Sequence, residues 1–179
     1  IDEWYLKNIE DKNLDKYISY NTGFCGDRSL NSGNGISLNE STSFSANNRL
    51  SNSKATFKCQ NISNDLYTTS SSEFGNKSLT YPIALITSDE LVYSGIDLNH
   101  VNKKSWSYSQ THYWTMTPSD YFAQQTSPHV IFSSMIGYLN PWNYVELSLD
   151  VRPVINLKSD VKITSGIGTV NEPFVIDTN

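Results

Sequence analysis

The spacing of hydrophobic and polar positions changes along the chain, and each change predicts a different kind of element. From Ile1 to Tyr20, apolar residues recur at intervals of three and four, which predicts one helix or two short ones packed by one face. Trp4 and Tyr5 are expected to anchor this helical region in the core. Residues 31–64 are rich in Asn, Ser, Thr and Gly with isolated apolar side chains, a composition that predicts a long irregular loop.

A continuous apolar run followed by helix-start residues marks the middle of the chain. Residues 79–87 predict a buried strand, and a short helix is predicted to begin after it at Ser88. Thr87 or Ser88 would serve as the N-cap, and Asp89 and Glu90 are favourable at the positive end of the helix dipole. Adjacent carboxylates can also indicate acid–base chemistry, but their place at a helix start favours capping.

Further strands are predicted around an aromatic stretch in the second half of the chain. In residues 113–118, Trp114 and Met116 alternate with threonines, which is the period of a strand with one buried face. The other predicted strands are Val130–Phe132, Tyr144–Leu149 and Val151–Leu157, and residues 161–164 and 173–176 predict a last hairpin. Together with the N-terminal helices, this order predicts an α+β fold with a largely antiparallel, twisted sheet and long irregular loops.

Length and charge narrow the classes of function. At 179 residues the chain can bury the core of one domain, and we expect a single domain over residues 1–179. The net charge is −5 and the basic residues are scattered, so no basic stripe is present to bind nucleic acid. No apolar run approaches the roughly 20 residues that a membrane-spanning helix needs. We expect an ectodomain whose signal or anchor lies upstream of Ile1.

The two cysteines, Cys25 and Cys59, leave two interpretations open. A disulfide between them would close a loop of roughly 35 residues, stabilise the fold by about 3 to 4 kcal/mol in a chain-entropy treatment, and suit an extracellular protein. Two buried free thiols, packed as small hydrophobic side chains, are the alternative. Arg28 and Arg49 lie in the same loop-rich region, and we expect them to bind loop carbonyls or a carboxylate rather than a ligand.

The segment from Ser119 to Asp150 combines aromatic side chains with adaptable hydrogen-bonding ones, as binding loops do. Tyr and Trp offer rigid contact area, and the amides, the histidine and the carboxylate offer hydrogen bonds. The candidate ligand-binding residues are Tyr121, Gln124, His129, Tyr138, Asn140, Trp142, Asn143, Tyr144 and Glu146. For each aromatic residue, the alternative is a place in the core beneath long loops.

The sequence contains no motif that predicts catalysis or metal binding. His100, His112 and His129 are far apart in the chain and lack the helical spacing that directs two imidazoles to one metal. No serine lies in a Gly-x-Ser-x-Gly elbow, and no glycine-rich phosphate loop is present. We therefore predict a protein that is not an enzyme and that needs no metal or cofactor.

Motifs spread over nearly the whole chain resemble those of a known family. They are Phe24-Cys25-Gly26-Asp27-Arg28-Ser29, Phe57-Lys58-Cys59, the strand and helix start from Thr80 to Glu90, Tyr113-Trp114-Thr115-Met116-Thr117-Pro118 and Val151-Arg152-Pro153-Val154-Ile155-Asn156-Leu157. With these motifs the chain resembles uncharacterised surface or pilin-linked domains of Firmicutes. That family is distantly similar to the C-type lectin fold of formylglycine-generating enzymes and retroelement variable proteins. The resemblance implies a C-type lectin-like fold that displays residues 119–150 for binding, supported by the strand that contains Arg152.

Two departures limit what the resemblance implies. Formylglycine-generating enzymes use a reactive cysteine pair near the end of the chain, whereas no cysteine follows Cys59 here. Asn140-Pro141-Trp142-Asn143 matches the calcium-binding tripeptides of sugar lectins only superficially. The first hypothesis is therefore an extracellular bacterial, adhesin-like domain that binds a protein or glycan on another cell or surface. The second is a structural subunit of a pilus or surface assembly, and the third is an oxidase-like enzyme.

Overall fold

The computed structural model describes residues 1–169 and 171–177, and its N-terminal region is helical but short. α1 spans Asp2–Asn8, followed by two 3₁₀ turns, η1 (Glu10–Lys12) and η2 (Asp15–Tyr17). Tyr5, Ile9 and Ile18 pack with Ile83 in one of two hydrophobic clusters. The expectation that Trp4 anchors the core is wrong, because Tyr5 occupies the inward face of this short helix and Trp4 remains 41% exposed.

Residues 31–64 contain more regular structure than their composition predicts. This part of the chain holds β2 (Leu30–Ser32), β3 (Thr42–Phe44), α2 (Ser45–Ser51) and α3 (Ile62–Asp65). The prediction of an irregular loop is wrong for α2 because Ala46 and Leu50, one turn apart, suffice to bury one face of the helix. β3 gains its regularity from pairing with β6, a strand distant in the sequence.

A disulfide ties this part of the chain to the segment before it. β1 (Phe24–Cys25) pairs antiparallel with β4 (Leu66–Tyr67), and Cys25 is bonded to Cys59. The disulfide interpretation is therefore confirmed, and the alternative of two free thiols is wrong.

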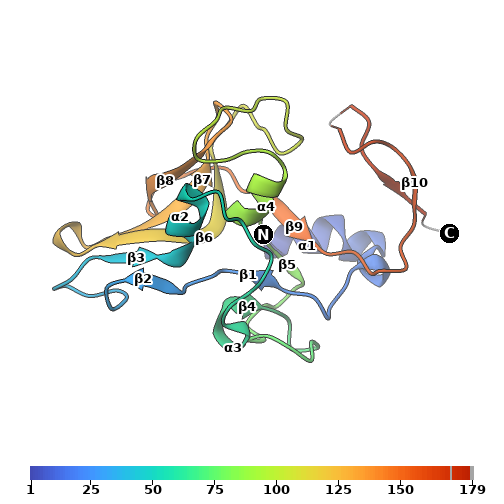
Figure 1. Cartoon of the computed structure of the whole chain (residues 1–179). Helices are drawn as coiled ribbons and strands as arrows, with labels where there is room; N and C mark the ends of the chain where they lie inside the picture. The colour runs from blue at the N-terminus through green and yellow to red at the C-terminus, as the bar shows by residue number, and fades with distance from the viewer. Residues whose placement is uncertain (170, 178–179) are drawn as a thin grey trace.

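An antiparallel sheet of five strands, in the order β2-β3-β6-β7-β8, dominates the fold (Figure 1). β6 is Tyr113–Phe122, β7 is Ser127–Ser133 and β8 is Leu139–Tyr144, and the 3₁₀ turn η3 (Ala123–Gln125) joins β6 to β7. β6 has the predicted alternation, but its threonines point inward: Thr115 and Thr117 are buried, whereas Trp114 and Met116 are half-buried.

The third predicted strand of this region, Tyr144–Leu149, is wrong in its bounds. β8 ends at Tyr144, and its pairing with β7 is made instead by the polar residues that precede Tyr144. An irregularity in the register between Asn140 and Asn143 accommodates Pro141, which cannot donate a backbone hydrogen bond. β8 is also an edge strand, where a proline is tolerated.

The second hydrophobic cluster joins the sheet to α2 and α4. It comprises Leu50, Ile86, Leu91, Ile96, Tyr113, Ile131 and Leu139. Beside it, β5 (Ile83–Leu85) pairs antiparallel with β9 (Pro153–Ile155), and both are shorter than predicted. α4 (Ser88–Tyr93) begins with a capping box, in which the Thr87 hydroxyl accepts from the Glu90 N–H and the Glu90 carboxylate accepts from the Thr87 N–H. The predicted helix start is confirmed.

The C-terminal hairpin forms as predicted, from β10 (Ile163–Ser165) and β11 (Val175–Ile176). Figure 1 shows it (red) set apart from the other elements. The helices and the mostly antiparallel strands confirm the α+β class. Among the residues that the structure describes, no helix has both the length and the apolar character needed to cross a membrane.

Candidate functional site

Four rings gather where β6, β7 and β8 meet η3, and we call this cluster the aromatic face: Phe122, His129, Trp142 and Tyr144. His129 pairs with Tyr144 across β7 and β8, so both side chains project from one side of the sheet. The ring centroid of His129 lies 4.6 Å from that of Tyr144 and 4.9 Å from that of Phe122. Trp142 is 58% exposed and Tyr144 is 37% exposed, so both rings are open to a ligand.

The imidazole of His129 is the buried centre of the aromatic face. His129 is 5% exposed, and neither Nδ1 nor Nε2 has a hydrogen-bond partner in the part of the chain that the structure describes. Desolvation lowers the pKa of His129 below its ordinary value, and the carboxylates of Asp120 and Glu146 act in the opposite direction. The imidazole is therefore neutral near pH 7, and both of its nitrogens are shielded from solvent.

Two side chains position the exposed rings. The Asn140 amide donates to Tyr138 Oη at 3.2 Å, and its carbonyl oxygen accepts from the Trp142 backbone N–H at 2.9 Å. At the other end of β8, Tyr144 Oη donates to Gln125 Oε1 at 3.4 Å. Asn140 and Tyr138, both among the predicted binding residues, are thus half-buried supports for Trp142.

The remaining predicted residues lie at three different depths. Gln124 and Glu146 are exposed, and Asn143 is half-buried. Tyr121 is 3% exposed and is paired with Thr42 in the sheet, so it packs beneath the surface and does not face solvent. The structure therefore brings His129, Trp142 and Tyr144 together and leaves Tyr121 in the core.

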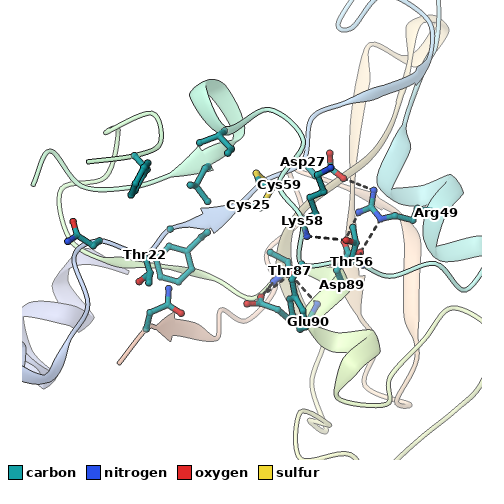
Figure 2. A pocket seen from close by; sticks show the side chains of 18 residues that line it. Thr22, Cys25, Asp27, Arg49, Thr56, Lys58, Cys59, Thr87, Asp89 and Glu90 are labelled. Atoms are coloured by element: carbon teal, nitrogen blue, oxygen red, sulfur yellow. Dashed lines mark hydrogen bonds and ion pairs between the residues drawn. A yellow bond between two sulfur atoms is a disulfide. The ribbon is translucent and has the colours of Figure 1, made fainter. Parts of the chain in front are cut away.

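A cleft of about 420 Å³ forms a second candidate site, between β1, the start of α4 and the loop that contains Cys59 (Figure 2). The Cys25–Cys59 bridge lies in its wall, next to Phe57 and Phe24. Its polar lining includes Asp27, Arg49, Thr56, Lys58, Asp89 and Glu90. Most of these polar groups are already bonded to one another.

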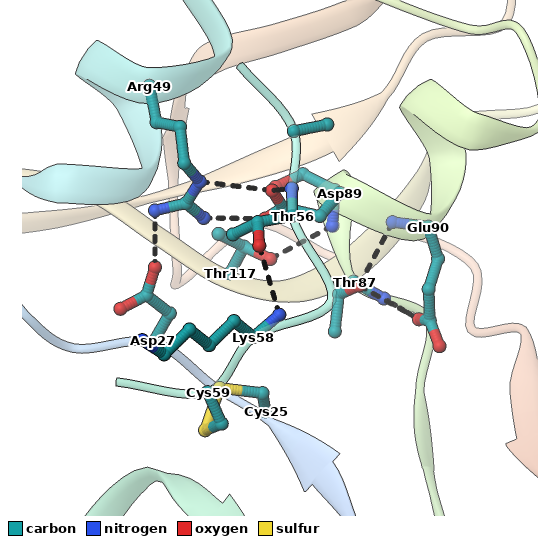
Figure 3. Close-up of polar contacts among 12 residues, drawn as sticks. Cys25, Asp27, Arg49, Thr56, Lys58, Cys59, Thr87, Asp89, Glu90 and Thr117 are labelled. Atoms are coloured by element: carbon teal, nitrogen blue, oxygen red, sulfur yellow. Dashed lines mark hydrogen bonds and ion pairs between the residues drawn. A yellow bond between two sulfur atoms is a disulfide. The ribbon is translucent and has the colours of Figure 1, made fainter. Parts of the chain in front are cut away.

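Arg49 lies between two buried carboxylates in the wall of this cleft (Figure 3). Its Nη1 donates to Asp27 Oδ2 at 2.6 Å, and its Nε and Nη2 donate to the two oxygens of Asp89 at 3.1 and 2.7 Å. Asp27 and Asp89 are 4% and 5% exposed, so the guanidinium compensates charges that have left water. Asp89 also accepts from the Thr56 N–H at 2.8 Å. This network holds the loop in place, and three N–H groups of the guanidinium are used within it.

The predicted roles of Asp89 and of the two arginines are confirmed in this region. Asp89 lies in the first turn of α4, as predicted, and its carboxylate is in addition the bidentate partner of Arg49. Arg28 makes the corresponding pair with Asp65, with Nε donating to Oδ1 at 2.8 Å. Both arginines therefore bind carboxylates, as the sequence predicts.

No group of three or more His, Cys, Asp and Glu side chains that could hold a metal ion occurs among the described residues. The three histidines lie in separate surroundings. His100 contacts the Asp97 carboxylate, the Nδ1 of His112 accepts from the Met135 N–H, and His129 belongs to the aromatic face.

Comparisons of the chain with protein-family models, curated proteins and solved structures found no match. The geometry of the sites is therefore the basis for the functional argument.

Three rings were not assigned to a site by sequence reasoning: Phe122, Phe57 and Trp106. Phe57 is 68% and Trp106 is 55% exposed. The available signal was that Phe57 and Trp106 each stand inside a polar stretch, where a large ring has few apolar neighbours to bury it. Phe122 follows Tyr121 at the end of a strand, and only the strand register shows that it faces His129.

Proposed function

We propose that this chain is an extracellular, adhesin-like domain that binds a protein or glycan through the aromatic face. The main support is the exposed Trp142, which lies on an edge strand with Tyr144 and has its ring centroid 6.5 Å from that of the buried His129. Trp and Tyr contribute much of the binding energy at recognition sites because they bury large area at low entropic cost. A ligand that packs on the exposed rings of Trp142 and Tyr144 removes this apolar area from water.

The same proposal includes a C-type lectin-like fold and a place on a bacterial surface. The Cys25–Cys59 disulfide supports an oxidising compartment. The antiparallel sheet supports a fold that displays residues 119–150, with Arg152 in the adjoining strand region as a fixed support. Arg152 lies over the Tyr113 ring, 4.9 Å from its centroid, and donates to the backbone oxygen of Ser107. We assign the face a binding role and no catalytic one.

The test is a screen of the purified domain against glycan and host-surface protein arrays, with and without calcium. For any ligand found, we expect Trp142→Ala and Tyr144→Ala each to weaken binding at least tenfold, about 1.4 kcal/mol, since hot-spot truncations commonly cost this much or more. Isothermal titration calorimetry measures the loss.

Trp4→Ala is the matched control, because Trp4 is also an exposed tryptophan but lies on α1, outside the aromatic face. The control should bind as the unmodified chain does. Full binding by a folded Trp142→Ala, Tyr144→Ala double variant would refute the proposed site.

A structural subunit of a pilus or surface assembly is the second candidate, and the C-terminal hairpin supports it. Ile163, Ile167, Phe174 and Val175 are 58, 66, 57 and 49% exposed, which is unusual for a two-stranded element that has little stability alone. Reversible, concentration-dependent association in sedimentation velocity, abolished by Phe174→Ser, would favour this candidate over a monomeric adhesin.

A further inference from the structure

A groove of about 550 Å³ runs beside α4, separate from the aromatic face, and we call it the α4 groove. Phe57, Tyr93 and Trp106 line it and are 68, 57 and 55% exposed. Ile86, Val154 and Ile155 contribute apolar surface, and Glu90 and Arg152 are its charged residues. We propose that the α4 groove binds a neutral saccharide unit of a glycan chain.

Trp106 is held in position by the serines on either side of it. Ser105 Oγ donates to the Ser94 carbonyl at 2.8 Å, which ties the loop to the end of α4. Ser107 is fully buried, and its carbonyl accepts from Tyr113 Oη at 2.7 Å and from the Arg152 guanidinium. An exposed ring on a fixed backbone loses little conformational entropy on binding.

The residues on either side of Phe57, Thr56 and Lys58, belong to the network around Arg49 that Figure 3 shows. The Thr56 N–H donates to Asp89 Oδ1 at 2.8 Å, and the Lys58 N–H donates to Thr56 Oγ1 at 3.0 Å. The Phe57 ring stacks on Tyr93, with centroids 4.2 Å apart. Tyr93 Oη in turn donates to the Ala55 carbonyl at 3.1 Å. The two stacked rings therefore form one wall of the groove, whose position is fixed before a ligand binds.

Glu90 and Arg152 retain free hydrogen-bonding capacity in the groove. Glu90 Oε2 accepts from the Thr87 N–H and hydroxyl at 2.7 and 2.9 Å, while Oε1 has no protein partner in the described chain. Arg152 uses Nη1 for the Ser107 carbonyl, and its remaining N–H donors have no acceptor among the described residues. The groove therefore offers one carboxylate acceptor and several guanidinium donors beside its aromatic surface.

A pyranose ring matches this combination, because its C–H faces pack on aromatic rings and its hydroxyl groups bond to carboxylates and guanidinium groups. A purely apolar ligand would cover Glu90 and Arg152 without hydrogen bonds, which is costly. An extended peptide added to β9 would gain few backbone bonds, because β9 is only three residues long and begins with Pro153, which has no N–H. A glycan chain is therefore the better occupant of the open groove.

The test titrates the intact domain with neutral hexasaccharides built from glucose, N-acetylglucosamine, mannose or galactose, followed by calorimetry and by the ¹H–¹⁵N signal of the Trp106 indole. We expect at least one hexasaccharide to bind and to shift that indole signal. Trp106→Ala should lower the affinity at least tenfold, and Tyr93→Leu should lower it as well. Trp4→Ala should bind as the unmodified chain does, and the Trp106 indole signal reports on the α4 groove rather than on the aromatic face.

Failure of every hexasaccharide to shift the Trp106 indole signal of the folded domain would overturn the proposal. So would saccharide binding that Trp106→Ala leaves unchanged. Capture of extended peptides that depends on Trp106, without saccharide binding, would assign the groove to a peptide and overturn the saccharide assignment. The indole signal is read on the unmodified chain, so the result does not depend on a variant that folds.

Discussion

Arg49 and His129 lie in two regions that differ in whether their buried polar groups have hydrogen-bond partners. Around Arg49, two buried carboxylates are bound by one guanidinium, and of their four oxygens Asp27 Oδ1 has no partner among the described residues. On the aromatic face, neither nitrogen of His129 has a partner in residues 1–169 and 171–177. A paired charge network holds one geometry, because any shift exposes an uncompensated charge to an apolar environment. A buried imidazole without a partner lowers the stability of the fold, a cost that proteins accept at functional sites. The first region therefore supports the fold, and the second is suited to binding.

The comparison predicts the largest loss of stability for Arg49→Met. This change leaves the carboxylates of Asp27 and Asp89 buried without their partner, so we expect the free energy of unfolding to fall by about 3 to 5 kcal/mol. Urea unfolding followed by circular dichroism measures the change. Arg28→Met is the comparison variant, because Arg28 binds a single buried carboxylate, Asp65, which keeps its bond from the Arg28 backbone N–H, and we expect a smaller loss of about 1 to 3 kcal/mol. Equal losses in the two variants would contradict the assigned role of the network.

The disulfide is the other support of this region, and its removal should have the next largest effect. The double change Cys25→Ser and Cys59→Ser reopens the loop that the bond closes, so we expect a loss of about 3 to 4 kcal/mol. The measurement is chemical unfolding without reductant, and added reductant should destabilise the unmodified chain but not the double variant. Ligand binding to the aromatic face should be retained under native conditions. A variant as stable as the unmodified chain would show that the bond contributes little.

The sequence predicted best those elements that depend on neighbouring residues. Thr87 and Glu90 are three residues apart, and their capping box follows from that spacing alone. The alternation in β6 and the C-terminal hairpin are likewise local patterns. Which side of β6 is buried was not predictable in this way, because Thr115 is inside only through its contacts with β7, where its hydroxyl bonds the Ile131 carbonyl.

Features that depend on distant partners were missed or left open. Arg49 reaches Asp27 and Asp89 across 22 and 40 residues, and no local pattern names those partners. The same limit applies to the candidate site, where Tyr121 and Trp142 both occur in polar surroundings in the sequence. Only the strand register places Tyr121 in the core and Trp142 at the surface. The aromatic composition therefore predicted a recognition segment, but it could not distinguish the aromatic residues that are buried beneath the surface from those whose rings are exposed.

The smallest predicted effect concerns the aromatic face. It is the pH dependence of the free energy of unfolding that arises from His129. Its folded-state pKa is lowered by desolvation, so as the pH falls the unfolded chain takes up a proton near pH 6.5 before the folded chain does. Below that pH, the free energy of unfolding decreases as the pH falls, by at most about 1.4 kcal/mol per pH unit. The decrease ends when the folded imidazole is also protonated.

His129→Phe removes this titration and keeps a ring against Phe122 and Tyr144. We therefore expect a smaller drop in Tm between about pH 7.5 and about pH 5.5 for the variant than for the unmodified chain, measured by differential scanning calorimetry. The neighbouring carboxylates of Asp120 and Glu146 are present in both proteins, so the difference between the two curves isolates the imidazole. Parallel curves would mean that His129 is hydrogen-bonded or hydrated in solution, and the face would then lose the unsatisfied group that distinguishes it from the Arg49 network.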